Sequence, residues 1–206
     1  APGIVCLAKS LGGGIMPVGA FIATGEVWNK AYGGIEKCLL HTSTFGGNTR
    51  AMAAGLATLE FIIRENLPER AARLGDYLLS GLRRLQEKYA LIKEVRGRGL
   101  LLGIEFEQPA KGVLARIAGA VNKISQEYLA SMVAGFLLNN HRIITAYTLN
   151  NPNVIRLEPP LIVTEEQLDI LLNALEDTFA KNRSFLGFGL ASGKTILAGR
   201  FGGKDR

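Results

Sequence analysis

Residues 4–22 constrain the fold most, because they place a lone lysine between two apolar runs and follow it with three glycines. The apolar runs at 4–8 and 18–23 are short, which is typical of strands in a buried sheet. Lys9 then lies at the end of a strand. The glycines at 12–14 lack a Cβ, so the backbone there can adopt positive φ and lie close to a flat ligand. The pattern predicts a strand, a tight turn that carries Lys9, and a second strand.

A lysine in that position has a specific chemistry open to it. Partial desolvation by the sheet edge would disfavour the ammonium form of Lys9, and the neutral amine can condense with an aldehyde. The alternative that these residues leave open is a surface lysine in a flexible loop.

The chain has 206 residues with 48% hydrophobic content, enough for one large domain or two small ones with a packed core. Its net charge of +6 comes from Lys and Arg scattered through helical segments, so we expect no nucleic-acid partner. The cysteines, Cys6 and Cys38, form no disulfide or zinc pattern, which favours a reducing, cytoplasmic setting.

No run of about 18 apolar residues occurs, and no leader precedes the first strand, so we expect no membrane association. Because the chain begins without Met and almost directly in a core strand, we expect it to be a fragment of a longer polypeptide.

Helical patterns dominate the next part of the chain. Thr24 is a candidate N-cap for a helix over 25–32, with Trp28 as its buried anchor. A second helix precedes Asn66, which starts a third that runs to about Tyr89. The expected apolar stripes are Met52, Leu56, Leu59 and Ile63 on the second helix, and Leu74, Leu78, Leu82 and Leu85 on the third.

The pattern then changes to strands. Residues 91–96 and 100–106 predict a hairpin about a Gly-Arg-Gly turn, followed by a loop over 108–119 and a helix over 124–138.

Strands are expected at 143–148 and 153–157, joined by an Asn- and Pro-rich turn. Thr164 and Gln167 form a capping box for a last helix, whose apolar stripe is Leu168, Leu171, Leu172, Leu175 and Phe179. The tail from Lys181 onward is rich in Gly, Lys and Arg, and we expect it to be partly disordered.

Two glycine motifs fail as nucleotide sites. Residues 187–195 lack the glycine spacing of a phosphate loop, and residues 97–99 lack the third glycine of the dinucleotide fingerprint. Arg96, Arg98 and Glu105 lie near a tight turn, where shape and solvation suffice to explain them, so we assign them no role.

Four segments in this order resemble the class III pyridoxal-phosphate aminotransferases: Leu-Ala-Lys-Ser-Leu-Gly-Gly-Gly at 7–14, Thr-Ser-Thr-Phe-Gly-Gly-Asn at 42–48, Arg-Gly-Arg-Gly-Leu-Leu at 96–101, and Ile-Arg-Leu-Glu-Pro-Pro at 155–160. The resemblance covers roughly residues 1–180. Within the class, Gly-Gly-Gly-Ile-Met-Pro at 12–17, His-Thr-Ser-Thr-Phe-Gly-Gly at 41–47, and Leu-Asn-Asn at 149–151 before the segment at 155–160 look most like the putrescine aminotransferases.

The resemblance implies a role for each of three residues. Lys9 resembles the lysine that holds pyridoxal 5'-phosphate and moves a proton once the substrate amine displaces it. Thr44 resembles the threonine that binds the phosphate of the neighbouring subunit's cofactor, together with backbone amides at a helix start, which implies a homodimer. Arg156 resembles the arginine that grips the carboxylate of a 2-oxo acid acceptor such as 2-oxoglutarate. The structural alternatives are a helix-entry turn for Thr44 and an ion pair at the edge of the core for Arg156.

The implied fold class is α/β, the C-terminal part of a fold-type I pyridoxal-phosphate transferase. Residues 1–66 would end the large cofactor domain, residues 67–181 would form a small α+β domain, and residues 182–206 a flexible basic tail. The implied reaction moves an amino group from an ω-amine donor to a 2-oxo acid.

Two alternatives stay open at this point. An ornithine, acetylornithine or 4-aminobutyrate aminotransferase would share every motif quoted. A basic binding module, using residues 181–206 to hold anionic polymers or membranes, belongs to another class, and heparin retention that disappears with the tail would favour it.

We expect the 206-residue chain alone, incubated with pyridoxal phosphate, to give no transaminase turnover. The family's phosphate loop, ring-stacking aromatic and ring-nitrogen aspartate all belong upstream of the reactive lysine, and without that aspartate the ring is a poor electron sink. Glutamate formation from putrescine and 2-oxoglutarate, followed by a coupled assay, would contradict this.

Overall fold

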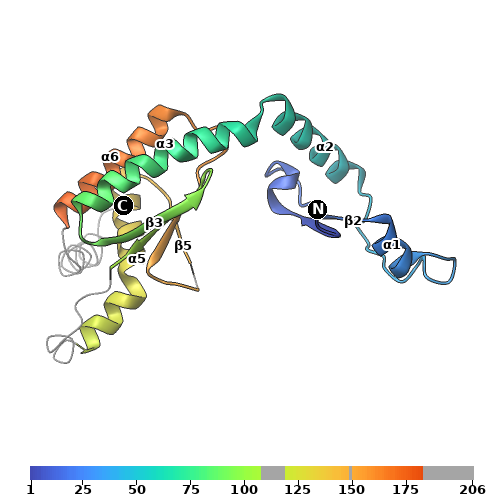
Figure 1. The fold of residues 1–206 in the computed structure, drawn as a ribbon, viewed down its shortest axis with the longest axis horizontal. Helices are drawn as coiled ribbons and strands as arrows, with labels where there is room; N and C mark the ends of the chain where they lie inside the picture. The colour runs from blue at the N-terminus through green and yellow to red at the C-terminus, as the bar shows by residue number, and fades with distance from the viewer. Residues whose placement is uncertain (108–118, 149, 183–206) are drawn as a thin grey trace, which may run out of the picture. The chain divides into compact units, whose positions relative to one another are not determined.

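The computed structural model describes residues 1–107, 119–148 and 150–182 (Figure 1). It divides into two compact units, one of residues Ala1–Leu67 and one that begins at Pro68. Residues 108–118 of the loop expected at 108–119, the tail beyond 182 and the rejected phosphate loop lie outside the described residues, and Gly119 begins a helix.

The first unit begins with the predicted strand, turn and strand. Strand β1 (Ile4–Leu7) pairs antiparallel with β2 (Ala20–Ala23), and the short helix η1 (Lys9–Gly12) follows β1 directly. The expected helix over 25–32 is confirmed as α1 (Gly25–Tyr32), capped by the Thr24 hydroxyl, which accepts a hydrogen bond from the Val27 amide at 3.4 Å. Helix α2 (Thr49–Arg64) completes the unit.

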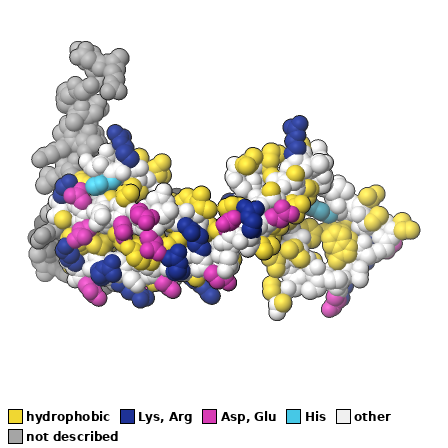
Figure 2. Space-filling model, turned by 90° about the horizontal axis from the view of Figure 1, so that it is seen from above, with side chains coloured by type: hydrophobic (Ala, Val, Ile, Leu, Met, Phe, Trp, Pro, Cys, Tyr) yellow, Lys and Arg dark blue, Asp and Glu magenta, His cyan; other side chains and the backbone are white. Residues whose placement is uncertain are grey.

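Burial in this unit differs from the sequence prediction. Both strands are largely exposed, because a two-stranded ribbon without a covering layer leaves its faces open to solvent. Trp28, the predicted buried anchor, is 49% exposed and instead stacks on Phe21 in a surface aromatic cluster with Tyr32. Figure 2 shows hydrophobic side chains lying open on the surface of this unit, at the right.

Helix α2 packs on η1 through its small residues and not through its large ones. Its buried residues are Ala51 and Gly55, and a Cβ on Gly55 would lie 3.8 Å from the Leu11 carbonyl oxygen. The predicted apolar stripe of Met52, Leu56, Leu59 and Ile63 is exposed, so that prediction was wrong. The periodicity marks an apolar face, but the close backbone approach occurs on the neighbouring face, where the side chains are small enough to permit it.

The second unit is a sheet covered by helices (Figure 1). The four strands are β3 (Ile92–Arg98), β4 (Leu101–Phe106), β5 (Ala146–Tyr147) and β6 (Val154–Leu157). Their order in the sheet is β3-β4-β6-β5, and every neighbouring pair is antiparallel. The helices are α3 (Leu67–Lys88), α5 (Gly119–His141) and α6 (Glu165–Lys181).

One face of the sheet carries the core. Along β4, Leu102, Ile104 and Phe106 are at most 2% exposed, whereas the alternate residues Gly103 and Glu105 point to the other, open face. The predicted stripe of α3 is confirmed as buried, and so is that of α6, where Leu172 is partly buried. The Thr164–Gln167 capping box is confirmed, with both of its hydrogen bonds present: the Thr164 amide donates to Gln167 Oε1, and the Gln167 amide donates to the Thr164 hydroxyl.

Several helix and strand boundaries in this unit differ from the sequence prediction. The hairpin turns at Gly99 and Leu100, two residues later than expected, because Gly97 and Arg98 continue β3 and Gly99 adopts a φ of 55°. Helix α5 is longer than predicted at both ends, and β5 is reduced to two residues.

Gly75→Ala should destabilise the chain, although alanine favours a helix by about 1 kcal/mol over glycine. A Cβ on Gly75 in α3 would lie 2.2 Å from the Gly99 carbonyl oxygen, so helix and hairpin turn must move apart. We expect a net loss of about 1–3 kcal/mol in the free energy of unfolding, measured by urea denaturation.

Gly135→Ala is the matched control, because a Cβ there meets nothing within 4 Å in helix α5. We expect it to gain up to about 1 kcal/mol from helix propensity. Equal effects of the two substitutions would contradict the packing argument.

Candidate functional site

Lys9 begins η1 immediately after β1, in the turn that the sequence predicted. Its backbone has a φ of 57°, in the left-handed region that is unfavourable for a residue with a side chain and costs on the order of 1–3 kcal/mol. Gly13 and Gly14 also have positive φ, at 64° and 77°. A Cβ on Gly13 would lie 2.8 Å from the Thr58 hydroxyl oxygen of α2, so the turn is held tightly against that helix.

The Lys9 side chain is exposed, which corrects the expectation that its neighbours desolvate it. The reason is that β1 and β2 form an open two-stranded ribbon, with no covering layer at the strand end. Any desolvation of this amine must come from groups outside the first unit.

Thr44 lies in the turn that leads into α2, and its side chain is exposed. The turn is closed by hydrogen bonds from the Gly46 amide to the Ser43 carbonyl and from the Asn48 amide to the Phe45 carbonyl, both 3.2 Å. Within the first unit, all of which the structure describes, the Thr44 hydroxyl makes no hydrogen bond and is free to donate or accept one.

The backbone amides expected to assist Thr44 are already engaged. Asn48 caps α2, and its Oδ1 accepts hydrogen bonds from the Arg50 and Ala51 amides at 3.1 and 3.2 Å. An anion at this helix start would therefore have to compete with the Asn48 side chain, or bind through the Thr44 hydroxyl and the turn before the cap.

Arg156 lies on β6 in the second unit, on the open face of the sheet. The pairing register places Arg96, Gly103, Arg156 and Ala146 in one row across β3, β4, β6 and β5. Directly paired residues of antiparallel strands point to the same face, so two arginines flank a glycine on this face. The Arg156 Nη1 lies 3.2 Å from the Glu158 Oε1, and the two side chains are 44% and 42% exposed.

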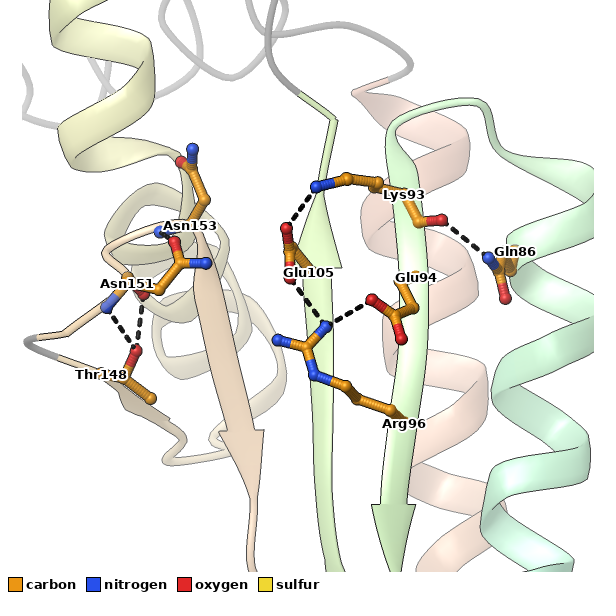
Figure 3. Close-up of polar contacts among 8 residues, drawn as sticks. All are labelled: Gln86, Lys93, Glu94, Arg96, Glu105, Thr148, Asn151 and Asn153. Atoms are coloured by element: carbon orange, nitrogen blue, oxygen red, sulfur yellow. Dashed lines mark hydrogen bonds and ion pairs between the residues drawn. The ribbon is translucent and has the colours of Figure 1, made fainter.

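Arg96, the other arginine of this row, is neutralised by a network of charged side chains. Arg96 Nη1 contacts Glu105 at 2.7 Å and Glu94 at 2.8 Å, and Lys93 Nζ donates to Glu105 at 2.6 Å (Figure 3). The hydrogen bonds from Lys93 and then Arg96 hold the pKa of Glu105 below its ordinary value. The Glu105 carboxylate in turn raises the pKa of Arg96. Only 13% of the Glu105 side chain is exposed, so this network is partly withdrawn from water.

Sequence reasoning missed the row of Arg96, Gly103 and Arg156 and the partner Glu158. The period-2 alternation of β4 and β6 could have assigned these residues to one face, but the register between strands far apart in sequence could not be deduced.

The three predicted site residues are divided between the two units. Lys9 and Thr44 belong to the first and Arg156 to the second. A pocket of about 490 Å³ in the second unit is lined by Thr145, Glu158, Gln167 and mostly apolar neighbours, and includes none of the three. Within the described residues, no cluster of metal-ligating side chains occurs and no helix is long and apolar enough to cross a membrane.

Similarity to known proteins defines the class. The family model for Aminotransferase class-III matches residues 1–179. The chain therefore belongs to the class III aminotransferase family, whose members depend on pyridoxal phosphate, and its α/β fold is part of the fold of those enzymes.

Solved structures agree with this assignment. Acetylornithine aminotransferase from Elizabethkingia anophelis is 35% identical, with a TM-score of 0.69 over 86% of this chain and 40% of its own. An amine transaminase from an uncultivated Pseudomonas species, in a PLP-bound form, is 31% identical, with a TM-score of 0.71 over 87% and 38%. Ornithine δ-aminotransferase of Plasmodium falciparum is 30% identical, with a TM-score of 0.68 over 86% and 40%. The chain thus spans about 40% of the length of these structures.

Glu105→Gln should make the chain less stable at neutral pH. It should also make the free energy of unfolding depend less on pH in the acid range. The folded pKa of Glu105 is below its ordinary value of 4.5, so the native chain binds fewer protons than the unfolded chain between the two values. The contribution of Glu105 is therefore complete above about pH 4.5 and is lost as the pH falls through the folded pKa.

We expect Glu105→Gln to cost about 1–3 kcal/mol at pH 7, with a difference from the native chain that shrinks below pH 4.5, measured by urea denaturation across pH. Glu94→Gln is the control and should cost less, because the Glu94 side chain is 51% exposed. A difference that stays constant down to pH 3 would refute the assignment.

Proposed function

We propose that this chain is part of a longer class III aminotransferase that moves an amino group from an ω-amine donor, a diamine such as putrescine, to a 2-oxo acid such as 2-oxoglutarate. Membership of the family over residues 1–179 is the observation that carries the proposal. Because the chain spans about 40% of its relatives, we assign residues 1–66 to the large cofactor domain, 67–181 to a small domain and 182–206 to a basic tail.

The exposed apolar surface of the first unit supports a larger assembly. The large side chains of β1, β2 and α2 are open to solvent, including Ile22 at 59% and Leu56 at 59%. Contiguous apolar surface of this kind is typical of an interface, and the occupant we propose is the remainder of the large domain.

The residues of the first unit fit the family's cofactor. Pyridoxal phosphate requires an amine to hold its aldehyde and hydrogen-bond donors for its phosphate. The unit offers the accessible amine of Lys9 for one cofactor and the free hydroxyl of Thr44 for the phosphate of the neighbouring subunit's cofactor. When bound, the cofactor supplies an electron sink for negative charge on the substrate carbon.

The chain's own residues would then have separate tasks. Lys9 holds the cofactor and, once released, moves a proton at the reacting carbon of the substrate. Its left-handed backbone, in a turn packed on α2 at Gly13, sets the direction in which the Lys9 side chain leaves the backbone. Thr44 binds a phosphate across the interface of a homodimer, and Arg156 binds the acceptor carboxylate.

A second candidate is favoured by the similarity to acetylornithine and ornithine aminotransferases at 35% and 30% identity. These relatives are about as similar to this chain as the amine transaminase is, so family membership alone leaves the donor undecided.

Lys9→Ala in the full-length protein should abolish both turnover and the visible absorbance of lysine-bound cofactor. The substitution removes the amine and leaves the glycines of the turn unchanged. Lys30→Ala is a matched control, because Lys30 is an exposed lysine of the same unit, engaged only in a surface ion pair with Glu26. Retention of the absorbance band in Lys9→Ala would remove Lys9 from this role.

A further inference from the structure

Gly103 is the residue of β4 that pairs directly with Arg156 on β6. Directly paired residues of antiparallel strands point to the same face, so a side chain at position 103 would stand beside the Arg156 side chain. Glycine inside a strand weakens it, because the backbone is more flexible and there is no side chain to pack. A glycine in one of the two central strands of this sheet therefore calls for a physical reason.

Neither packing nor conformation within the described residues requires glycine at this position. The irregularity in the pairing of β3 with β4 lies between Ile92 and Glu94, away from Gly103. The Gly103 backbone does not have a positive φ. A Cβ there would lie 3.4 Å from Val154 Cγ1, its nearest neighbour among those residues, which is an ordinary contact. An alanine would therefore fit.

Small residues on this face are found directly beside Arg156. Two residues away along the same face of β4, Leu101 carries a large side chain that is 58% exposed, and Glu105 carries a long charged one. On the other side of Arg156, the paired residue of β5 is Ala146. Arg156 is thus flanked on both neighbouring strands by a residue with little or no side chain.

The chemistry beside Gly103 indicates what approaches it. A strand glycine that serves no bulge or bend is typical of a place where a ligand or another backbone comes close. The neighbouring Arg156 side chain is 44% exposed, and a guanidinium binds a carboxylate through two parallel hydrogen bonds. A peptide backbone brings no negative charge to such a group. A carboxylate ligand therefore fits this place better than a second backbone does.

We propose that Gly103 sets the affinity of the enzyme for its acceptor, because the carbon chain of the 2-oxo acid bound by Arg156 lies in the space above it. Ala146 borders the same space from β5. A side chain at position 103 would fill this space and exclude the acceptor. An amine donor without a carboxylate has no group for Arg156 and would be unaffected. This inference rests on the proposed function and adds a specificity-determining residue to it.

The test replaces Gly103 by alanine and by valine in the full-length enzyme and measures kcat/KM separately for putrescine and for 2-oxoglutarate. When the two substrates react in separate half-reactions, each kcat/KM reports only the half-reaction of its own substrate. We expect kcat/KM for 2-oxoglutarate to fall about threefold in Gly103→Ala and about tenfold or more in Gly103→Val, with that for putrescine changed less than about twofold.

Two further measurements separate this role from a structural one. Both substitutions should leave the melting temperature unchanged or raise it, because alanine and valine are better strand residues than glycine. The dissociation constant of glutarate, an unreactive dicarboxylate, should rise in the same order when measured by calorimetry. Leu101→Val is the matched control on the same face of β4, and it should change neither kcat/KM nor the binding of glutarate.

An unchanged kcat/KM for 2-oxoglutarate in Gly103→Val overturns the inference, and so does an equal fall for both substrates. A lower melting temperature in Gly103→Ala also overturns it, because packing against another part of the full-length protein would then account for the glycine. A native enzyme inactive with every pair of amine and 2-oxo acid overturns the proposed function itself.

Discussion

The buried face of the sheet β3-β4-β6-β5 determines the rest of the second unit. Ile104 and Ile155 are fully buried beneath the helices, and along β4 the positions from Leu102 to Phe106 alternate between that core and the open face. Once Ile104 points inward, its neighbours Gly103 and Glu105 must point outward. The charged row and its network are thus a consequence of core packing, since a shift of one residue in register would bury the charges and expose the core.

The first unit lacks an equivalent constraint. Its buried residues are chiefly small, such as Ala51 and Gly55, and its large apolar side chains are open to solvent. What holds Lys9 in place is therefore local: a left-handed turn closed by glycines and packed on one helix. Such a turn sets the backbone direction at Lys9, but it does not provide the low-polarity surroundings that the proposed role of this lysine requires. On the proposed function, the remainder of the large domain supplies those surroundings.

Patterns among residues a few positions apart predicted local structure well. Contacts between elements far apart in the sequence could not be predicted in this way. The stripe of α3 and the capping box of α6 depend on residues three or four apart, which local pattern describes fully. The predictions that the α2 stripe and Trp28 are buried were wrong, because an apolar pattern identifies a face without identifying what covers it. The roles of Lys9, Thr44 and Arg156 came from ordered motifs and remain predictions. The row that joins Arg96 to Arg156 could be recognised only from the pairing register of the strands, which the sequence does not give.

The two arginines of that row differ in how their charges are neutralised within the described residues. A carboxylate approaching Arg96 must displace Glu105, which is only 13% exposed and already shared with Lys93. A carboxylate approaching Arg156 displaces Glu158, which returns to water at little cost. If Arg156 binds the acceptor as proposed, this difference in desolvation explains why an anionic ligand would bind there and not at Arg96. The same argument makes Glu105 the member of this network whose loss of a partner costs most, because Arg96 and Glu94 are each about half exposed.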